Sequence, residues 1–127
     1  MNKKNIALIS ILLLCTIISS GCTVYSDEES FVLDAQTYVS YEFEMFEGDI
    51  LDASISTVQG PIDVYVLDAE NMYRYDEYLN RFEYDEYYEN VLSRNIEFTA
   101  PYDGRWYLVL VNEENYDIAL DISYEVY

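Results

Sequence analysis

Carboxylates are the commonest side chains of this sequence that can do chemistry. The chain has 25 aspartates and glutamates against six lysines and arginines, and it has no histidine. Hard cations such as calcium bind several oxygen ligands at about 2.3–2.6 Å, so closely spaced acids are candidate ligands. Glu47, Asp49 and Asp52 form such a cluster. The alternative, which the composition favours, is a solvated acidic face, because a chain this acidic contains such clusters by chance.

Tyrosines gather in one segment of the chain. The candidates for a binding surface there are Tyr73, Tyr75, Tyr78, Tyr84, Tyr87 and Tyr88. Tyrosine rings at a surface stack on sugars or anchor a protein partner, so a glycan or an envelope protein is the expected occupant. The alternative, which the helical spacing of the rings favours, is that they pack over the domain as part of its core.

Catalytic machinery is hard to assemble from these residues. Beyond Gly21 the chain has no histidine and no lysine, and its one cysteine there is Cys22. Most nucleophile and base pairs therefore lack a member. Two acids can cleave glycosides when they face each other across a cleft, but nothing in the spacing marks such a pair. We expect no enzyme, and no cofactor other than calcium.

The first 21 residues differ from the rest. Lys3 and Lys4 precede an apolar run over 6–18, and the small residues Ser19, Ser20 and Gly21 end it. A positive start, an apolar core and a small-residue exit are the three parts of a secretory signal. The run has about 13 residues, too few to cross the roughly 30 Å of a bilayer core comfortably. Residues 1–21 are therefore predicted to be a signal peptide.

The junction before Cys22 resembles the lipobox of bacterial and archaeal lipoproteins. In that family a diacylglyceryl group is added to the cysteine thiol, and the signal is cut just before it. Ser19 stands where the family prefers leucine. The resemblance implies an exported chain held on the outer face of a membrane through Cys22, with 22–30 as a polar tether. The alternatives are an ordinary signal peptide with an incidental Cys22, and an uncleaved anchor.

The charge of the remaining chain restricts its partners. Four arginines and all 25 acidic residues follow Gly21, which gives that part a net side-chain charge of −21. Nucleic acid is not an expected partner, because phosphate backbones need a basic footprint. Anionic headgroups also repel such a domain. A basic partner fits this charge. A life in brine is a further hypothesis, because molar salt shortens the screening length to about 3 Å.

Alternating apolar and polar residues indicate β-strands from Phe31 onward. The clearest runs are 39–45, 51–56, 62–67, 95–99, 106–111 and 118–126. Turn residues such as Gly48 and Gly60 separate several of them. Short strands with regular turns are typical of an antiparallel sandwich or barrel. The runs 62–67 and 106–111 are apolar on both faces, so each needs a second cover.

A different period interrupts the strands between 68 and 94. Met72, Tyr75, Leu79 and Phe82 recur at helical spacing. A second series of Tyr84, Tyr87, Tyr88 and Val91 does the same. This pattern predicts a short helical excursion around 69–92, which could cover the two strands that are apolar on both faces.

The order of these segments resembles a known family. The segments that carry the resemblance are 43–45, 48–49, 62–68, 98–101 and 104–112. They are similar to the pre-peptidase C-terminal (PPC) type of β-sandwich and, more loosely, to Golgi-dynamics (GOLD) domains. The resemblance covers residues 31–127, and it implies one mainly β, jelly-roll-like domain of about 7–8 strands. It also implies a domain that binds or positions something and is not catalytic.

These observations together predict a membrane-anchored, extracytoplasmic lipoprotein with a non-catalytic binding or scaffolding β-sandwich. One alternative is an accessory or sensing subunit of an envelope transporter or peptidase complex. Another is a surface module stabilised by calcium. Residue types and spacing alone do not choose between them.

Overall fold

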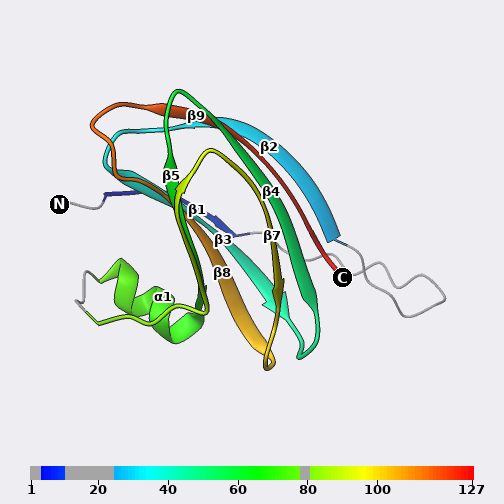
Figure 1. Ribbon diagram of the computed structural model, residues 1–127. Coiled ribbons are helices and arrows are strands. Elements are labelled where there is room, and N and C mark those ends of the chain that lie inside the picture. Colours follow the sequence, from blue (N-terminus) through cyan, green and yellow to red (C-terminus); the bar gives the residue numbers. More distant parts are fainter. Residues whose placement is uncertain (1–3, 11–24, 78–80) are drawn as a thin grey trace.

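The computed structural model describes residues 4–10, 25–77 and 81–127, and the predicted lipidation site Cys22 lies outside these ranges. The described residues form two β-sheets packed face to face, with one helix outside them (Figure 1). In chain order the elements are β1 (Lys4–Ser10), β2 (Tyr25–Leu33), β3 (Thr37–Met45), β4 (Ile50–Val58), β5 (Ile62–Asp68), α1 (Ala69–Asp76), β6 (Glu86–Val91), β7 (Ser93–Thr99), β8 (Gly104–Asn112) and β9 (Ile118–Val126).

Strands that are neighbours in a sheet are mostly not consecutive in the chain. One sheet has the order β1-β3-β8-β5-β6, and the other has the order β2-β9-β4-β7. Neighbouring strands are antiparallel, except that β1 runs parallel to β3. The predicted mainly β, antiparallel sandwich is confirmed.

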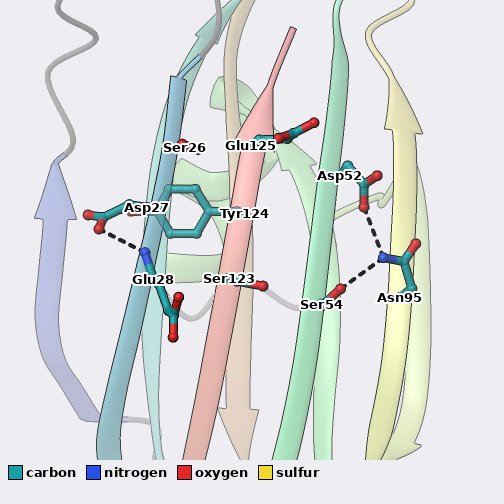
Figure 2. Close-up of a pocket in the computed structure, with 9 residues that line it drawn as sticks. All are labelled: Ser26, Asp27, Glu28, Asp52, Ser54, Asn95, Ser123, Tyr124 and Glu125. Atoms are coloured by element: carbon teal, nitrogen blue, oxygen red, sulfur yellow. Dashed lines mark hydrogen bonds between the residues drawn. The ribbon is translucent and has the colours of Figure 1, made fainter.

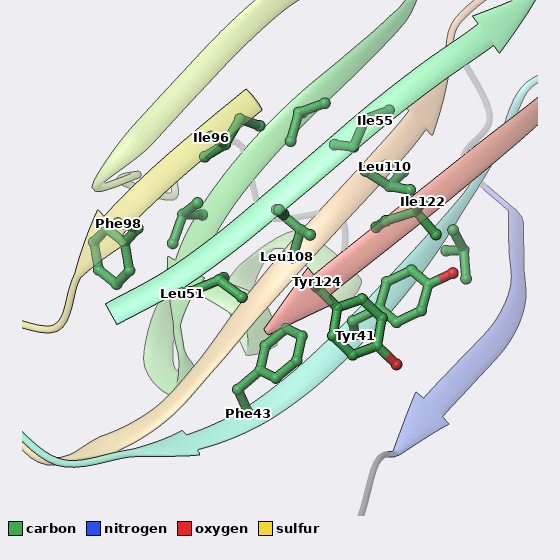
Figure 3. Packing of buried hydrophobic residues seen from close by; sticks show 14 of the residues in the cluster. Tyr41, Phe43, Leu51, Ile55, Ile96, Phe98, Leu108, Leu110, Ile122 and Tyr124 are labelled. Atoms are coloured by element: carbon green, nitrogen blue, oxygen red, sulfur yellow. The ribbon is translucent and has the colours of Figure 1, made fainter. Parts of the chain in front are cut away.

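The main core fills the space between the sheets. On β4, Leu51 and Ile55 are buried there, whereas Ser54 between them is exposed on the outer face. Trp106 on β8 is fully buried, and its ring centroid lies 5.0 Å from that of Phe98 on β7. Figure 3 shows aliphatic and aromatic side chains of both sheets meeting in this layer. Each fully buried large apolar side chain stabilises the fold by about 1.5–3 kcal/mol.

A second core lies on the outer face of the five-stranded sheet, under α1. Its buried members are Tyr38, Leu67, Met72, Tyr75, Val109 and Val111. The helix begins after Asp68, whose Oδ1 accepts a hydrogen bond from the Asn71 backbone N at 2.9 Å. Such a cap contributes about 1 kcal/mol. The helix thus supplies the cover that the two-faced apolar strands β5 and β8 require, as predicted.

The prediction of a second helical stretch is wrong. Glu86–Val91 is strand β6, which pairs with β5 at the edge of its sheet. The register shifts between Ile62 and Val64, and Asn90 has a positive φ of 55°. This irregularity interrupts strict alternation, so the spacing of the apolar residues imitates a helical period.

The predicted tether is also shorter than expected. Residues 25–30 belong to β2, which pairs along its whole length with β9. Ser26, Glu28 and Ser30 are exposed on the outer face of an edge strand, so this stretch carries no apolar signal of a strand. Residues 4–10 of the predicted signal peptide form β1, while cleavage after Gly21 stays a prediction. Within the described ranges, no helix has the length and apolar character needed to cross a membrane.

Candidate binding face

The outer face of the four-stranded sheet carries polar side chains in register across all its strands. We call this surface the polar face. Its three rows are Ser26, Glu125, Asp52 and Glu97; then Glu28, Ser123, Ser54 and Asn95; then Ser30, Asp121, Ser56 and Ser93. The face arises because outward positions of β2, β9, β4 and β7 alternate with buried ones in each strand. Among the described residues, the one helix, α1, packs on the other sheet, and no helix lies over the polar face (Figure 1).

The polar face is hollowed along its length. An open depression of about 510 Å³ is lined by Ser26, Asp27, Glu28, Asp52, Ser54, Asn95, Ser123, Tyr124 and Glu125 (Figure 2). A neighbouring depression of about 400 Å³ extends over Ser56, Ser93, Arg94 and Asp121. The many serines keep side chains short, so the surface can accept a partner close to the sheet.

Local hydrogen bonds fix part of the polar face. The Asn95 Nδ2 donates to Asp52 Oδ1 at 2.9 Å and to Ser54 Oγ at 2.9 Å (Figure 2). At the other end, Ser30 Oγ donates to Asp121 Oδ1 at 2.5 Å. These bonds hold the carboxylates of Asp52 and Asp121 in place while leaving further lone pairs for a partner.

The electrostatic character of the polar face is negative. Its rows contain the carboxylates of Glu28, Asp52, Glu97, Asp121 and Glu125. The guanidinium of Arg94 borders the face, and it lies 4.1 Å from the centroid of the Tyr88 ring. A surface dominated by one sign of charge concentrates ligands of the opposite sign. The face is therefore suited to positively charged groups.

Asp49 and Asp52, two of the three predicted calcium ligands, accept hydrogen bonds within the structure. Asp49 Oδ2 accepts a hydrogen bond from the Phe46 backbone N at 2.8 Å and so closes the turn between β3 and β4. The Glu47 backbone N donates to Asp103 Oδ1 at 2.7 Å, and Asp52 binds Asn95 on the polar face. In the described part of the chain, no group of three or more acids or cysteines is placed to hold a metal ion.

The predicted tyrosine surface is divided among different environments. Tyr75 is buried in the second core at 1% exposure, whereas Tyr73 and Tyr84 are more than half exposed. Tyr87 stacks on Tyr65, with ring centroids 4.5 Å apart.

Two further members of that predicted surface lie elsewhere. Tyr88 packs against the main core, whereas Tyr87 stacks on Tyr65, which packs against the second core. Tyr78 lies outside the described residues. The six tyrosines were grouped because they are close in the sequence, but neighbouring residues of β6 point to opposite faces of its sheet, which separates Tyr87 from Tyr88.

Tyrosine hydroxyls are the donors for several carboxylates. The pairs are Tyr38 with Asp76, Tyr41 with Glu29, Tyr102 with Asp68, Tyr107 with Glu42 and Tyr124 with Asp27. We call these pairs the tyrosine–carboxylate bonds. They give acids a hydrogen-bond donor in a chain with few basic residues.

Hydrogen bonding and burial shift the pKa of Tyr102, Tyr107 and Asp68 among these pairs. The hydrogen bond to Asp68 at 2.6 Å, together with burial, raises the pKa of Tyr102 to about 12. Burial and the hydrogen bond to Glu42 raise the pKa of Tyr107 to about 12. Burial opposes ionisation of Asp68, but the hydrogen bonds from Tyr102 and Asn71 lower its pKa below the ordinary value.

Asn112 is a structural residue that the sequence pattern did not reveal. Its side chain is fully buried at the end of β8. Its Nδ2 donates to the carbonyls of Leu33, Asp34 and Tyr116, and its Oδ1 accepts from the Glu114 backbone N. It therefore joins two loops at the end of the sandwich opposite the start of β2.

Comparisons with known proteins support the fold. No family model matches the chain, and no curated protein matches it. Among solved structures, the periplasmic lysozyme inhibitor of g-type lysozyme (PliG) from Aeromonas hydrophila matches with a TM-score of 0.61 and 8% identity, covering 99% of this chain and 100% of that one. PliG from Salmonella Typhimurium matches with a TM-score of 0.53 and 13% identity, over 94% and 97% of the two chains.

A third match connects the fold to the resemblance seen in the sequence. The pre-peptidase C-terminal domain of a collagenase from Bacillus anthracis matches with a TM-score of 0.53 and 12% identity, over 98% of this chain and 97% of that domain. The predicted likeness to PPC sandwiches is confirmed at the level of the fold. At such low identity, the arrangement of strands is what these proteins share with the chain.

Proposed function

We propose that this chain is an exported, non-catalytic binding protein that holds a basic protein partner on the polar face. The observation that carries the proposal is the set of carboxylates arrayed in register across four strands, among short serine side chains and over an open depression. A negative net charge over the whole domain adds long-range attraction to such a partner. Charge complementarity of this kind speeds association and excludes acidic competitors.

The structural neighbours support a binding role outside the cytoplasm. Both PliG proteins are described as periplasmic and as inhibitors of g-type lysozyme. In those proteins the fold serves the recognition of another protein. A g-type lysozyme with a basic isoelectric point is therefore a suitable probe for the polar face.

We test the binding proposal by neutralising three carboxylates of the polar face. The triple variant Asp52→Asn, Asp121→Asn and Glu125→Gln is expected to bind the lysozyme about tenfold more weakly than the wild type, a change of about 1.4 kcal/mol. The loss should shrink as salt rises from low to molar concentration, because salt screens exposed charges. Calorimetric titration measures both effects.

A matched control changes the same charge elsewhere. Glu44→Gln, Glu83→Gln and Glu89→Gln remove three exposed carboxylates outside the polar face, and this triple is expected to lose less than about threefold in affinity. Equal losses in the two triples would show that net charge, and not the polar face, controls binding. Absence of saturable binding by the wild type would overturn the proposal.

The anchoring part of the proposal concerns Cys22. Because β2 begins at Tyr25, an extended chain places Cys22 within about 11 Å of the sheet. A lipid on Cys22 would hold the start of β2 next to the membrane, with β2 and its partner β9 extending away from it. This distance is shorter than a tether over 22–30 would allow. A lipid on Cys22 would therefore keep the start of β2 close to the lipid headgroups.

Labelling with a fatty acid in the native host tests this anchor. We expect the wild type to carry the label and Cys22→Ala to lose it and leave the membrane fraction. Cys15→Ala is the matched control, because Cys15 lies in the predicted signal peptide, and it should leave labelling unchanged. An unlabelled wild type, or equal label in Cys22→Ala, would refute lipidation.

A further inference from the structure

The polar face ends in exposed apolar side chains. Beyond its third row, Val32, Ala119 and Val58 face one another in register across β2, β9 and β4. Val32 and Val58 are 57% and 58% exposed, and Ala119 lies between them. We call Val32, Ala119 and Val58 the apolar end.

This grouping differs from ordinary scattered exposure. Single apolar residues at a protein surface are common and need no explanation. Here they come from three separate strands, and the pairing of the strands brings them together. The preceding outward positions of β4, Ser54 and Ser56, show that serine satisfies the same geometry. Contiguous apolar surface beside a polar rim marks an interaction site.

Two other occupants fit the apolar end poorly. A second copy of the chain would bring the carboxylates of Asp121 and Glu28 against identical charges, which costs binding energy. A lipid surface also fits poorly, because the carboxylates of the adjoining polar face are repelled by anionic headgroups. Val32 also lies seven residues from Tyr25 along β2, about 23 Å from the end of the strand that a lipid on Cys22 would hold.

We infer that the apolar end receives apolar side chains of the same basic protein partner that the polar face attracts. This inference rests on the proposed function and adds where the stable contact forms. Interfaces commonly have an apolar centre beside polar and charged groups. Charges chiefly set the rate of association, whereas desolvated apolar contacts set the rate of dissociation. The two parts of the surface should therefore affect different rate constants.

The test compares the kinetics of variants against the basic g-type lysozyme. The double variant Val32→Ser and Val58→Ser is expected to dissociate about tenfold faster, with an association rate within about twofold of the wild type. The double variant Asp52→Asn and Asp121→Asn should instead associate more slowly and show a weaker dependence on salt. Surface plasmon resonance at several salt concentrations separates the two rate constants.

Phe46→Ser is the matched control. Phe46 is 64% exposed in the turn between β3 and β4, at the opposite end of the sandwich, so its loss should leave both rate constants unchanged. Val32→Thr with Val58→Thr keeps the branched shape that strands favour and guards against misfolding of the serine variant. If the wild type binds and both valine variants dissociate at its rate, this inference fails while the proposed function stands. If the wild type does not bind, the proposed function itself fails.

Discussion

Replacing Asn112 with alanine is expected to lower the free energy of unfolding by about 3–5 kcal/mol. The side chain is fully buried and makes four hydrogen bonds to backbone groups, at 3.0 Å to the Leu33 carbonyl, 3.2 Å to Asp34, 2.8 Å to Tyr116 and 2.9 Å from the Glu114 N. The alanine substitution removes all four of these hydrogen bonds at once and leaves the backbone groups without their partner. A buried backbone group left unsatisfied costs about 1–3 kcal/mol; the bond to the Leu33 carbonyl is buried, and the other three are partly buried. Urea unfolding measures the loss.

Two further variants sharpen this prediction. Asn115→Ala changes an exposed asparagine of the same loop and should alter stability by less than about 0.5 kcal/mol. Asn112→Asp keeps the shape but sets a buried negative charge against three carbonyl oxygens, so it should destabilise strongly at neutral pH. A stability of Asn112→Ala within about 1 kcal/mol of the wild type would contradict the role assigned to Asn112.

The second large effect is expected at alkaline pH, where the domain should unfold cooperatively above about pH 10. Burial raises the pKa of Tyr41 and Tyr75 far above its usual value, with Glu29 adding to the effect at Tyr41. In the unfolded chain these phenols ionise near pH 10.

The sign of this linkage follows from the raised pKa. The folded state keeps protons that the unfolded state releases, so the stabilisation is complete below about pH 10 and is lost progressively as the pH rises above it towards the raised pKa of the folded state. Each tyrosine that stays protonated in the folded state lowers the free energy of unfolding by about 1.4 kcal/mol for every pH unit above 10. For Tyr41 and Tyr75 together, the loss between pH 10 and pH 12 is about 5 kcal/mol. That loss is comparable to the whole stability of a small domain.

Phenolate absorbance and near-ultraviolet circular dichroism, recorded together, test the alkaline transition. We expect a steep rise in absorbance that coincides with the loss of tertiary signal. Tyr41→Phe should move the transition to higher pH, because one of the ionising groups is gone, while Tyr73→Phe removes an exposed hydroxyl and should leave it in place. Gradual ionisation of all tyrosines in a domain that stays folded would contradict this account.

Most of the fold could be predicted from the chain because its strands alternate cleanly. The β4 segment, with Leu51 and Ile55 inside and Ser54 outside, is one example. The need for a cover over β5 and β8 also followed from their apolar character on both faces. In contrast, β6 was misread because a register shift beside Ile62 breaks its alternation. The start of β2 was missed because an edge strand with a polar outer face resembles a linker.

The candidate site was less predictable, since it depends on which strands are neighbours. Alternation showed that Asp52 and Asp121 point outward, but only the pairing of β4 with β9 places them on one surface. The role of Asn112 depends on two loops that close on it from distant parts of the chain. Local spacing contains no signal for either arrangement, because both arise from the topology of the sandwich.

The tyrosine–carboxylate bonds affect how the fold responds to its solvent. A phenol donates without carrying a charge, so a contact such as that of Tyr102 with Asp68, 2.6 Å apart, is not an ion pair that dissolved salt weakens. Repulsion among the many carboxylates does weaken as salt is added, because its range contracts from about 10 Å at 0.1 M to about 3 Å at 1 M. Salt therefore affects the two kinds of interaction differently. Concentrated salt weakens the repulsion among the carboxylates and leaves the tyrosine–carboxylate bonds intact.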